Sequence, residues 1–552
     1  MSPDVVLAGG RVWTGAPAAS GSRPPDRSDA VALAGGRVVA LGAEALALRM
    51  EAGEVVDLAG GLAMPAFGDG HAHPVQGGLE EAGPAVREAG SVAGVADAVR
   101  SWAAAHPDEE WIVGASYDPA LDPVLAPGGR FDAEWLDAAV ADRPVVLRAA
   151  DYHTIWCNTE ALRRAGVGPA TPEPAIGRIE RREDGSPLGT LREWQACDLV
   201  LDAAPRPRAT DVEGALRRAG ARFAAAGVTW VQDAWVDLDP RAGGFGAFDA
   251  WLALAGRGEL ALRAALALRV DPLSWREQVE PFVAARARAD AEGAARVSAG
   301  TVKIFADGVV EGGTAALLEP YADDPLSYGI PVWDWDELRE ACTQFDAHGF
   351  QLHVHAIGDA AVRAALDAVE HVIAVNGPRD RRPVIAHAQV VHPDDLARFA
   401  ALGVVANLEP LWAQQDALMK QLTVPRLGAE RTRWQYPMAS LLRSGARISF
   451  GSDWPVTSLA PLEGVRVAVT RTTPDGLPPG GWLPGERLTV EQALTAYTAG
   501  VGFQSFEDDR GALTVGARAD VVVLDRDVLG GPPEATAEAQ VLAVWCAGAR
   551  TA

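Results

Sequence analysis

The middle of the chain alternates short apolar runs with longer stretches of helical pattern, and this alternation constrains the fold most. Apolar runs of strand length separated by helical segments are typical of βαβ units and a parallel sheet. Eight such runs predict the strands of a (β/α)8 TIM barrel, a fold of the α/β class. They are residues 63–68, 228–232, 263–270, 301–306, 351–356, 384–388, 404–408 and 448–452.

The two ends of the chain have a different, β-rich pattern. Residues 31–34 and 37–40 flank a Gly-Gly pair, which accepts positive φ and predicts a β-hairpin. Residues 520–524 and 541–545 are also strand-like. We therefore expect a composite β-sandwich domain and a metal-dependent barrel with an inserted lid and substrate subdomain, because the first two barrel strands lie too far apart for one crossover helix. The predicted ranges are 1–62 with 511–552, 63–510, and 76–220 for the insert.

Charge and cysteine content narrow the possible partners. Acidic residues outnumber basic ones by 74 to 49, a net charge of −25, which disfavours nucleic acid and anionic membranes. The four cysteines form no C-x-x-C pair, and neither a signal peptide nor a bilayer-spanning run is visible. We expect a cytoplasmic protein with reduced thiols that takes a small-molecule substrate, with a homodimer as one expected assembly.

Several histidines fall at the downstream ends of predicted strands, which form the active-site face of this fold. His71 and His73 follow the first strand, and residues i and i+2 of an extended segment point the same way, so both can grip one metal ion. An isolated H-x-H is more often part of a surface loop. His355 ends the fifth run, whereas His353 lies one layer deeper and is expected to be a hydrogen-bonded core histidine.

Two further strand ends carry candidate ligands. His387 lies in the run 384–388, and Asp453 follows the run 448–452 and brings a carboxylate to the rim. Each residue alone has a structural explanation. Together the strand ends supply the nitrogen and oxygen donors that Zn²⁺ or a similar ion prefers.

Lys303 lies in an apolar strand and shares a face with Phe305 and Asp307. Burying an ammonium is costly, so desolvation lowers the pKa, and the neutral amine can react with carbon dioxide to form a carbamate. A carbamate can bridge two metal ions. The alternative is a lysine that is ion-paired with Asp307 or reaches solvent.

Several runs resemble the amidohydrolase superfamily, and more closely its YtcJ-like branch, which includes N-substituted formamide deformylases. The similarity extends nearly from end to end. One departure is the run Ala-Phe-Gly-Asp-Gly-His at 66–71, where relatives more often have Gly-Phe-Ile-Asp-x-His; both histidines are kept. The runs that carry the resemblance are residues 5–15, 151–159, 189–193, 303–308, 355–359, 451–455 and 511–521.

The resemblance implies a metal site and its ligands. It implies one or two Zn²⁺ ions, other divalent metals being alternatives, with two ions bridged by a carboxylated Lys303 as our expectation. Asp453 and Lys303 are the expected catalytic residues. The implied metal ligands are His71, His73, Lys303, His355, His387 and Asp453.

Five further residues are candidate substrate contacts. His153 and Asn158, in the predicted insert, either face the site or hold the insert together by hydrogen bonds. Asp307, Glu311 and Trp454 complete the set.

The expected reaction is hydrolysis of a non-peptide carbon–nitrogen bond, of the amide or formamide type, by metal-bound hydroxide with Asp453 as general base. The same site could serve deamination, ester or lactam hydrolysis, or isomerisation, because a fold does not dictate one reaction. A non-catalytic metal-binding barrel is an alternative from another class, and the complete ligand set argues against it.

Overall fold

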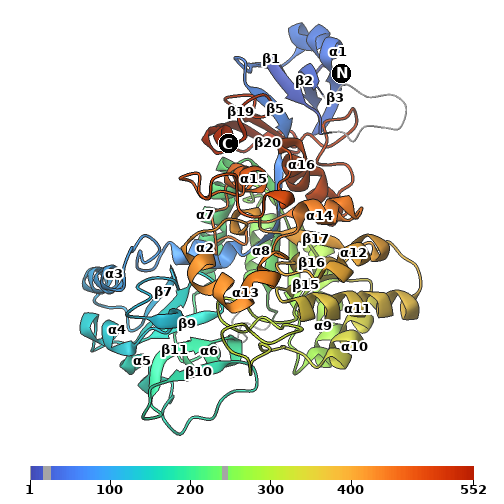
Figure 1. Ribbon diagram of the computed structural model, residues 1–552. Helices are drawn as coiled ribbons and strands as arrows, with labels where there is room; N and C mark the ends of the chain where they lie inside the picture. The colour runs from blue at the N-terminus through green and yellow to red at the C-terminus, as the bar shows by residue number, and fades with distance from the viewer. Residues whose placement is uncertain (1, 16–26, 239–245) are drawn as a thin grey trace.

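The computed structural model describes residues 2–15, 27–238 and 246–552, and three sheets organise this part of the chain (Figure 1). The central sheet runs β18-β17-β16-β15-β14-β13-β12-β6 with every neighbouring pair parallel. Its outer strands also meet, since the backbone N–H of Asp453 donates to the carbonyl of His71 at 2.7 Å. The predicted TIM barrel is confirmed. Its strands are β6 (Phe67–Ala72), β12 (Val228–Val236), β13 (Arg263–Arg269), β14 (Val297–Phe305), β15 (Gln351–Ala356), β16 (Val384–His387), β17 (Val405–Leu408) and β18 (Arg447–Phe450).

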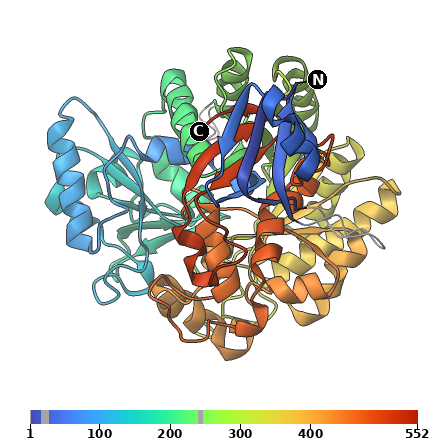
Figure 2. The ribbon, with the colours of Figure 1, turned by 90° about the horizontal axis from the view of Figure 1, so that it is seen from above.

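Helices surround the barrel, as the view from above shows (Figure 2). They form because apolar residues recur on one face, as in α11, where Val362, Leu366, Val369 and Val372 are buried at helical spacing. The helices that follow the insert are α7 (Ala209–Ala225), α8 (Ala247–Gly256), α9 (Trp275–Glu292), α10 (Trp335–Ala347), α11 (Asp359–Asn376), α12 (Leu396–Leu402), α13 (Val424–Thr432), α14 (Met438–Arg443), α15 (Pro461–Thr470), α16 (Val490–Thr495) and α17 (Val501–Gln504).

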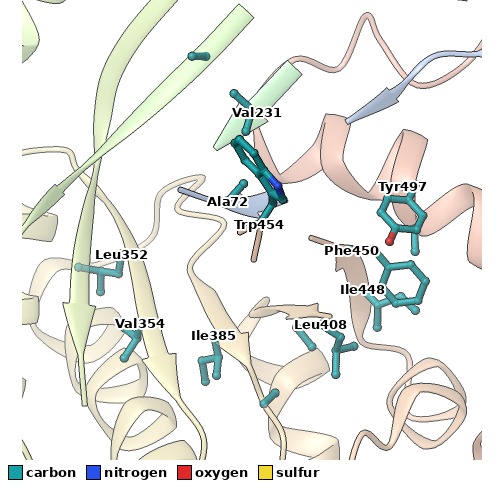
Figure 3. Close-up of a cluster of buried hydrophobic side chains, with 14 of the residues drawn as sticks. Ala72, Val231, Leu352, Val354, Ile385, Leu408, Ile448, Phe450, Trp454 and Tyr497 are labelled. Atoms are coloured by element: carbon teal, nitrogen blue, oxygen red, sulfur yellow. The ribbon is translucent and has the colours of Figure 1, made fainter. Parts of the chain in front are cut away.

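Alternation along the barrel strands separates core from site. Leu352 and Val354 of β15 belong to the apolar core together with Ile385 and Leu408 of neighbouring strands (Figure 3). His353 and His355 alternate with them and therefore project to the opposite face of the strand. One strand thus supplies both the packing that holds it and the side chains that line the barrel.

Both termini build the second sheet, which lies at one end of the barrel (Figure 1). The predicted hairpin is confirmed, because β2 and β3 pair antiparallel across Gly35 and Gly36. The order is β21-β20-β19-β5-β1-β2-β3, with β4 paired to β1. The elements are β1 (Val5–Trp13), β2 (Arg27–Ala34), β3 (Arg37–Leu41), α1 (Gly42–Ala47), β4 (Glu54–Asp57), β5 (Leu62–Pro65), β19 (Val521–Leu524), β20 (Val541–Cys546) and β21 (Ala549–Arg550).

The predicted first barrel strand, residues 63–68, is wrong in its bounds. It joins the end of β5, which pairs with β1 and β19, to the start of β6, which pairs with β12. The chain passes between the two sheets at Ala66. Both segments are fully buried, so hydrophobicity alone does not reveal the change of sheet.

The third sheet lies within the segment between β6 and β12 and projects to one side of the barrel (Figure 2). It has its own apolar core, which includes Val95, Ile112, Leu147 and Trp156. Within the described residues, no helix is both long and apolar enough to cross a membrane. The elements of this segment are α2 (Pro74–Glu80), α3 (Val92–Ala105), β7 (Ile112–Tyr117), α4 (Ala133–Ala139), β8 (Val145–Ala149), β9 (Thr154–Cys157), α5 (Thr159–Arg164), β10 (Arg178–Arg181), β11 (Pro187–Arg192) and α6 (Trp194–Leu201).

Candidate metal centre

The register of the parallel strands brings predicted ligands from different strands close together. Phe305 pairs with His355, and Ala356 pairs with His387, at the downstream ends of β14, β15 and β16. Lys303 pairs with His353 one layer deeper. The shared direction of the strands therefore gathers side chains that are far apart in the sequence.

Three donor atoms form the centre of this cluster. One ring nitrogen of His71, one of His387 and one carboxylate oxygen of Asp453 all lie within 4.8 Å of one another. Asp453 Oδ1 is 2.9 Å from His73 Nε2 and 3.6 Å from His71 Nε2. Lys303 Nζ is 3.1 Å from His71 Nε2. Imidazole nitrogens and a carboxylate in this arrangement fit a divalent cation such as Zn²⁺.

Burial keeps the imidazoles neutral, which is the form that binds metal. Burial is the main reason that the pKa values of His71 and His355 lie well below 6.5, and it lowers the pKa of His387 to about 3. The rings also crowd one another, with centroids 4.7 Å apart for His71 and His387. For Asp453, burial alone would raise the pKa, but the hydrogen bond from His73 and the neighbouring His387 and Lys303 lower it, so the carboxylate is ionised.

Two of these histidines have a close partner on Nδ1, and this partner orients the ring. His387 Nδ1 lies 2.8 Å from Glu409 Oε2, and His71 Nδ1 lies 2.8 Å from His353 Nε2. Such partners set which ring nitrogen faces a metal. His353 is thus a hydrogen-bonded core histidine, while Glu409 was missed from the sequence. Its only signal is an acidic residue directly after β17.

The backbone at two of these residues is strained. His387 and Asp453 have φ of 72° and 52°, a region that residues other than glycine rarely occupy. Strain of this kind is concentrated at functional sites, where the surrounding structure holds it in place.

Lys303 is completely buried, and burial lowers its pKa to about 7. Its amine lies 4.4 Å from the centroid of the Phe305 ring. The alternative ion pair with Asp307 is not formed among the described residues. Asp307 instead accepts hydrogen bonds from the backbone N–H groups of Ala316, Ile357 and Gly358.

A cavity of about 380 Å³ opens above the cluster. Its wall includes His153 from the insert, whose Nδ1 lies 2.9 Å from Glu193 Oε2. Burial opposes protonation of His153, but Glu193 and Asp151 outweigh it and raise the pKa to about 9. His153 therefore faces the cavity as an imidazolium. Glu193, like Glu409, was missed from the sequence.

The other predicted substrate contacts are divided between the cavity and the protein interior. Glu311 lines the cavity. The lining does not include Asn158, Asp307 or Trp454. Asn158 is buried in hydrogen bonds within the insert, and Trp454 packs against Phe223 with ring centroids 5.4 Å apart.

A parallel barrel with such donors at its strand ends defines the class of metal-dependent barrel hydrolases. The sequence profile of the Amidohydrolase family matches residues 54–552, and the chain therefore belongs to this family.

Relatives of known sequence support the YtcJ-like assignment. The chain is 30% identical over 515 residues to Protein LONG AFTER FAR-RED 3 of Arabidopsis thaliana, covering 90% of this chain and 84% of the relative. It is 29% identical to the putative amidohydrolase YtcJ of Bacillus subtilis over 86% of each chain. It is also 26% identical to the N-substituted formamide deformylase of Arthrobacter pascens over 94% of each.

A solved structure agrees. An uncharacterised metal-dependent hydrolase from Pyrococcus furiosus superposes with a TM-score of 0.69 at 26% identity, covering 95% of this chain and 99% of that one. The protein is a metal-dependent hydrolase of the amidohydrolase superfamily.

Proposed function

We propose that the protein hydrolyses the carbon–nitrogen bond of a small non-peptide amide, of which a formamide is the simplest case. The observation that carries the proposal is the convergence of His71, His387 and Asp453 in the lining of one cavity. The relative named N-substituted formamide deformylase supports the choice of bond. The cavity volume suits a small molecule rather than a polypeptide.

We propose that the four histidines at the strand ends and Asp453 hold the metal, with Zn²⁺ as the expected ion and Lys303, carboxylated, bridging a second. Such a cation would polarise the scissile carbonyl and lower the pKa of a bound water towards neutrality. The buried amine of Lys303, with its pKa near 7, is available as the neutral nucleophile that carbamate formation requires. The proposed ligands are His71, His73, His355, His387, Asp453 and Lys303.

Asp453 is the proposed proton carrier. Its Oδ1 lies 2.9 Å from His73 Nε2, and the residue lines the cavity, where a water molecule can reach the carboxylate. The ionised carboxylate would take a proton from the attacking water and return it to the leaving nitrogen.

His153 is the proposed substrate-orienting residue. Glu193 engages Nδ1, which leaves Nε2 to donate to a substrate oxygen. Because His153 comes from the insert and the ligands come from the barrel, the substrate would be held between the two.

Metal analysis and a substrate panel test the proposal. We expect purified protein to contain at least one zinc or other divalent ion per chain, and to hydrolyse formamides or amides faster than matched esters. Chelation should abolish the activity and zinc should restore it. A protein that binds no metal, or whose best substrates are esters or aminopurines, would contradict the proposal.

A further inference from the structure

Four carboxylates line the cavity without a cationic partner. Among the described residues, none of them forms an ion pair with lysine, arginine or histidine, and the hydrogen bonds they accept come from nearby backbone or hydroxyl groups. Glu193, next to the same cavity, is by contrast paired with His153. The four are Asp118, Asp151, Glu311 and Asp416.

The positive groups at the cavity do not balance this charge. Arg87 is held by Glu80, with Nε 2.7 Å from Oε1 and Nη2 3.0 Å from Oε2. His153 is held by Glu193. Both cations therefore donate to carboxylates of their own, and neither donates to one of the four.

Glu311 is the carboxylate most in need of a partner. Only 8% of the residue is exposed, and its Oε2 is buried without a hydrogen-bond donor among the described residues. An ionised carboxylate in this position is costly unless a donor or cation reaches it. Glu311 lines the cavity, so a molecule bound there can supply that donor.

Aromatic rings also line the cavity. The faces of such rings attract cations and exclude water from the charges around them. A cationic group in the cavity would therefore meet both carboxylates and π-systems. The rings are those of Tyr152, Trp235, Phe305, Trp412 and Tyr436.

We infer that the substrate carries a positively charged amino group in addition to its scissile amide, and that Glu311 is the main partner of this group. Asp118, Asp151 and Asp416 make the surrounding wall negative and favour cations over neutral or anionic analogues. The inference rests on the proposed function for the identity of the scissile bond, but the recognition of a cation does not depend on it.

A pair of substrates that differ only in charge tests the inference. Mono-N-formyl-1,4-diaminobutane and N-formylpentylamine have the same length, with an ammonium in one where the other has a methyl group. We expect kcat/KM to be at least tenfold higher for the cation. Glu311→Gln should reduce this preference at least tenfold, mainly through KM, because the neutral amide keeps the shape of the side chain and loses its charge.

Glu319→Gln is the matched control. Glu319 is exposed, so the substitution makes the same change in net charge away from the cavity and should leave the preference unchanged. Equal kcat/KM for the two formamides, or equal losses in the two variants, would overturn the inference.

A binding measurement separates this inference from the proposed reaction. Calorimetry at pH 7 on the metal-loaded protein compares 1,4-diaminobutane with 1,4-butanediol. We expect the diammonium to bind at least tenfold more tightly, and Glu311→Gln to remove that advantage. Tight diamine binding without any amide hydrolysis would reject the proposed function and keep the inference. Amide hydrolysis without diamine binding would reject the inference and keep the proposed function.

Discussion

At the scale of single residues, burial controls the chemistry of the centre. The same desolvation that keeps the histidines neutral also makes Lys303 a candidate for a neutral amine at physiological pH. Asp453 is the exception, since the hydrogen bond from His73 and the nearby donor groups lower its pKa and keep it ionised. The site therefore combines neutral nitrogen donors with one anionic oxygen, and the loss of that anion is the sharpest way to test it.

Asp453→Asn should lower kcat by about 10²–10⁴-fold, the usual contribution of a positioned acid–base group. The amide cannot take a proton from water, although its oxygen can still approach a metal. Metal content, measured by mass spectrometry of the purified variant, should stay close to that of the wild type. Full turnover by this variant would end the proposed role.

Glu409→Gln should weaken metal binding by about 10–100-fold, because Glu409 fixes the ring nitrogen that His387 presents. Zinc titration against a competing chelator measures the loss. A matched control is Glu430→Gln, which removes an exposed carboxylate and should leave the affinity unchanged. Equal affinities in the two variants would show that His387 is not a ligand or does not need this partner.

The histidines could be located from the sequence for two reasons. Alternation within a strand can be read from its own residues, and parallel strands bring their carboxyl ends to the same end of the barrel. Together these two features place His71, His355 and His387 at strand ends on the active-site face of the barrel. Glu409 and Glu193 were not found, because their roles depend on which ring they meet across the barrel. Neither is marked by a pattern in its own segment.

At the scale of elements, the alternation of strands and helices was enough to predict the barrel. It failed where β5 passes into β6, since two fully buried strands in different sheets have the same apolar pattern. The contacts inside the insert also could not be predicted from the sequence. For Asn158, the choice between substrate contact and structural support depends on hydrogen bonds to residues 140–145, which only the folded insert brings against it.

Asn158→Ala should destabilise the insert by about 1–3 kcal/mol while leaving KM unchanged. Asn158 Oδ1 accepts from the N–H groups of Val145 and Ala161, the second at the start of α5, and Nδ2 donates to the carbonyls of Val140 and Arg143. The substitution leaves these buried groups unpaired. Limited proteolysis and thermal unfolding measure the effect. A raised KM with unchanged stability would instead show that Asn158 contacts the substrate.

At the scale of the whole molecule, a buried ion-pair network joins the barrel to the terminal sheet. Arg263, the first residue of β13, donates through Nη1 to Asp520 Oδ1 at 3.2 Å, just before β19. Arg510, also completely buried, lies with its Nε 3.7 Å from Asp520 Oδ2. Glu507 also lies 3.1 Å from Arg263 and 3.7 Å from Arg510, so two carboxylates balance two guanidinium groups at this junction. The metal ligands lie at the opposite ends of the strands, so this junction bears on stability rather than on chemistry.

Asp520→Ala should therefore lower the free energy of unfolding by about 3–5 kcal/mol, because it removes the fully buried partner and leaves the two guanidinium groups with only the more exposed Glu507. Asp509→Ala is the control: its pairs with Arg37 and Arg518 are partly exposed, and such pairs are worth about 0–1 kcal/mol. Denaturant unfolding followed by tryptophan fluorescence compares the two. Because the folded-state pKa of Asp520 is held below its usual 3.8 by Arg263, the stabilisation should persist at neutral pH and disappear only as the pH falls below about 4. Similar losses in both variants, or a loss that vanishes at pH 7, would mean that the terminal sheet is held to the barrel by apolar packing and not by this network.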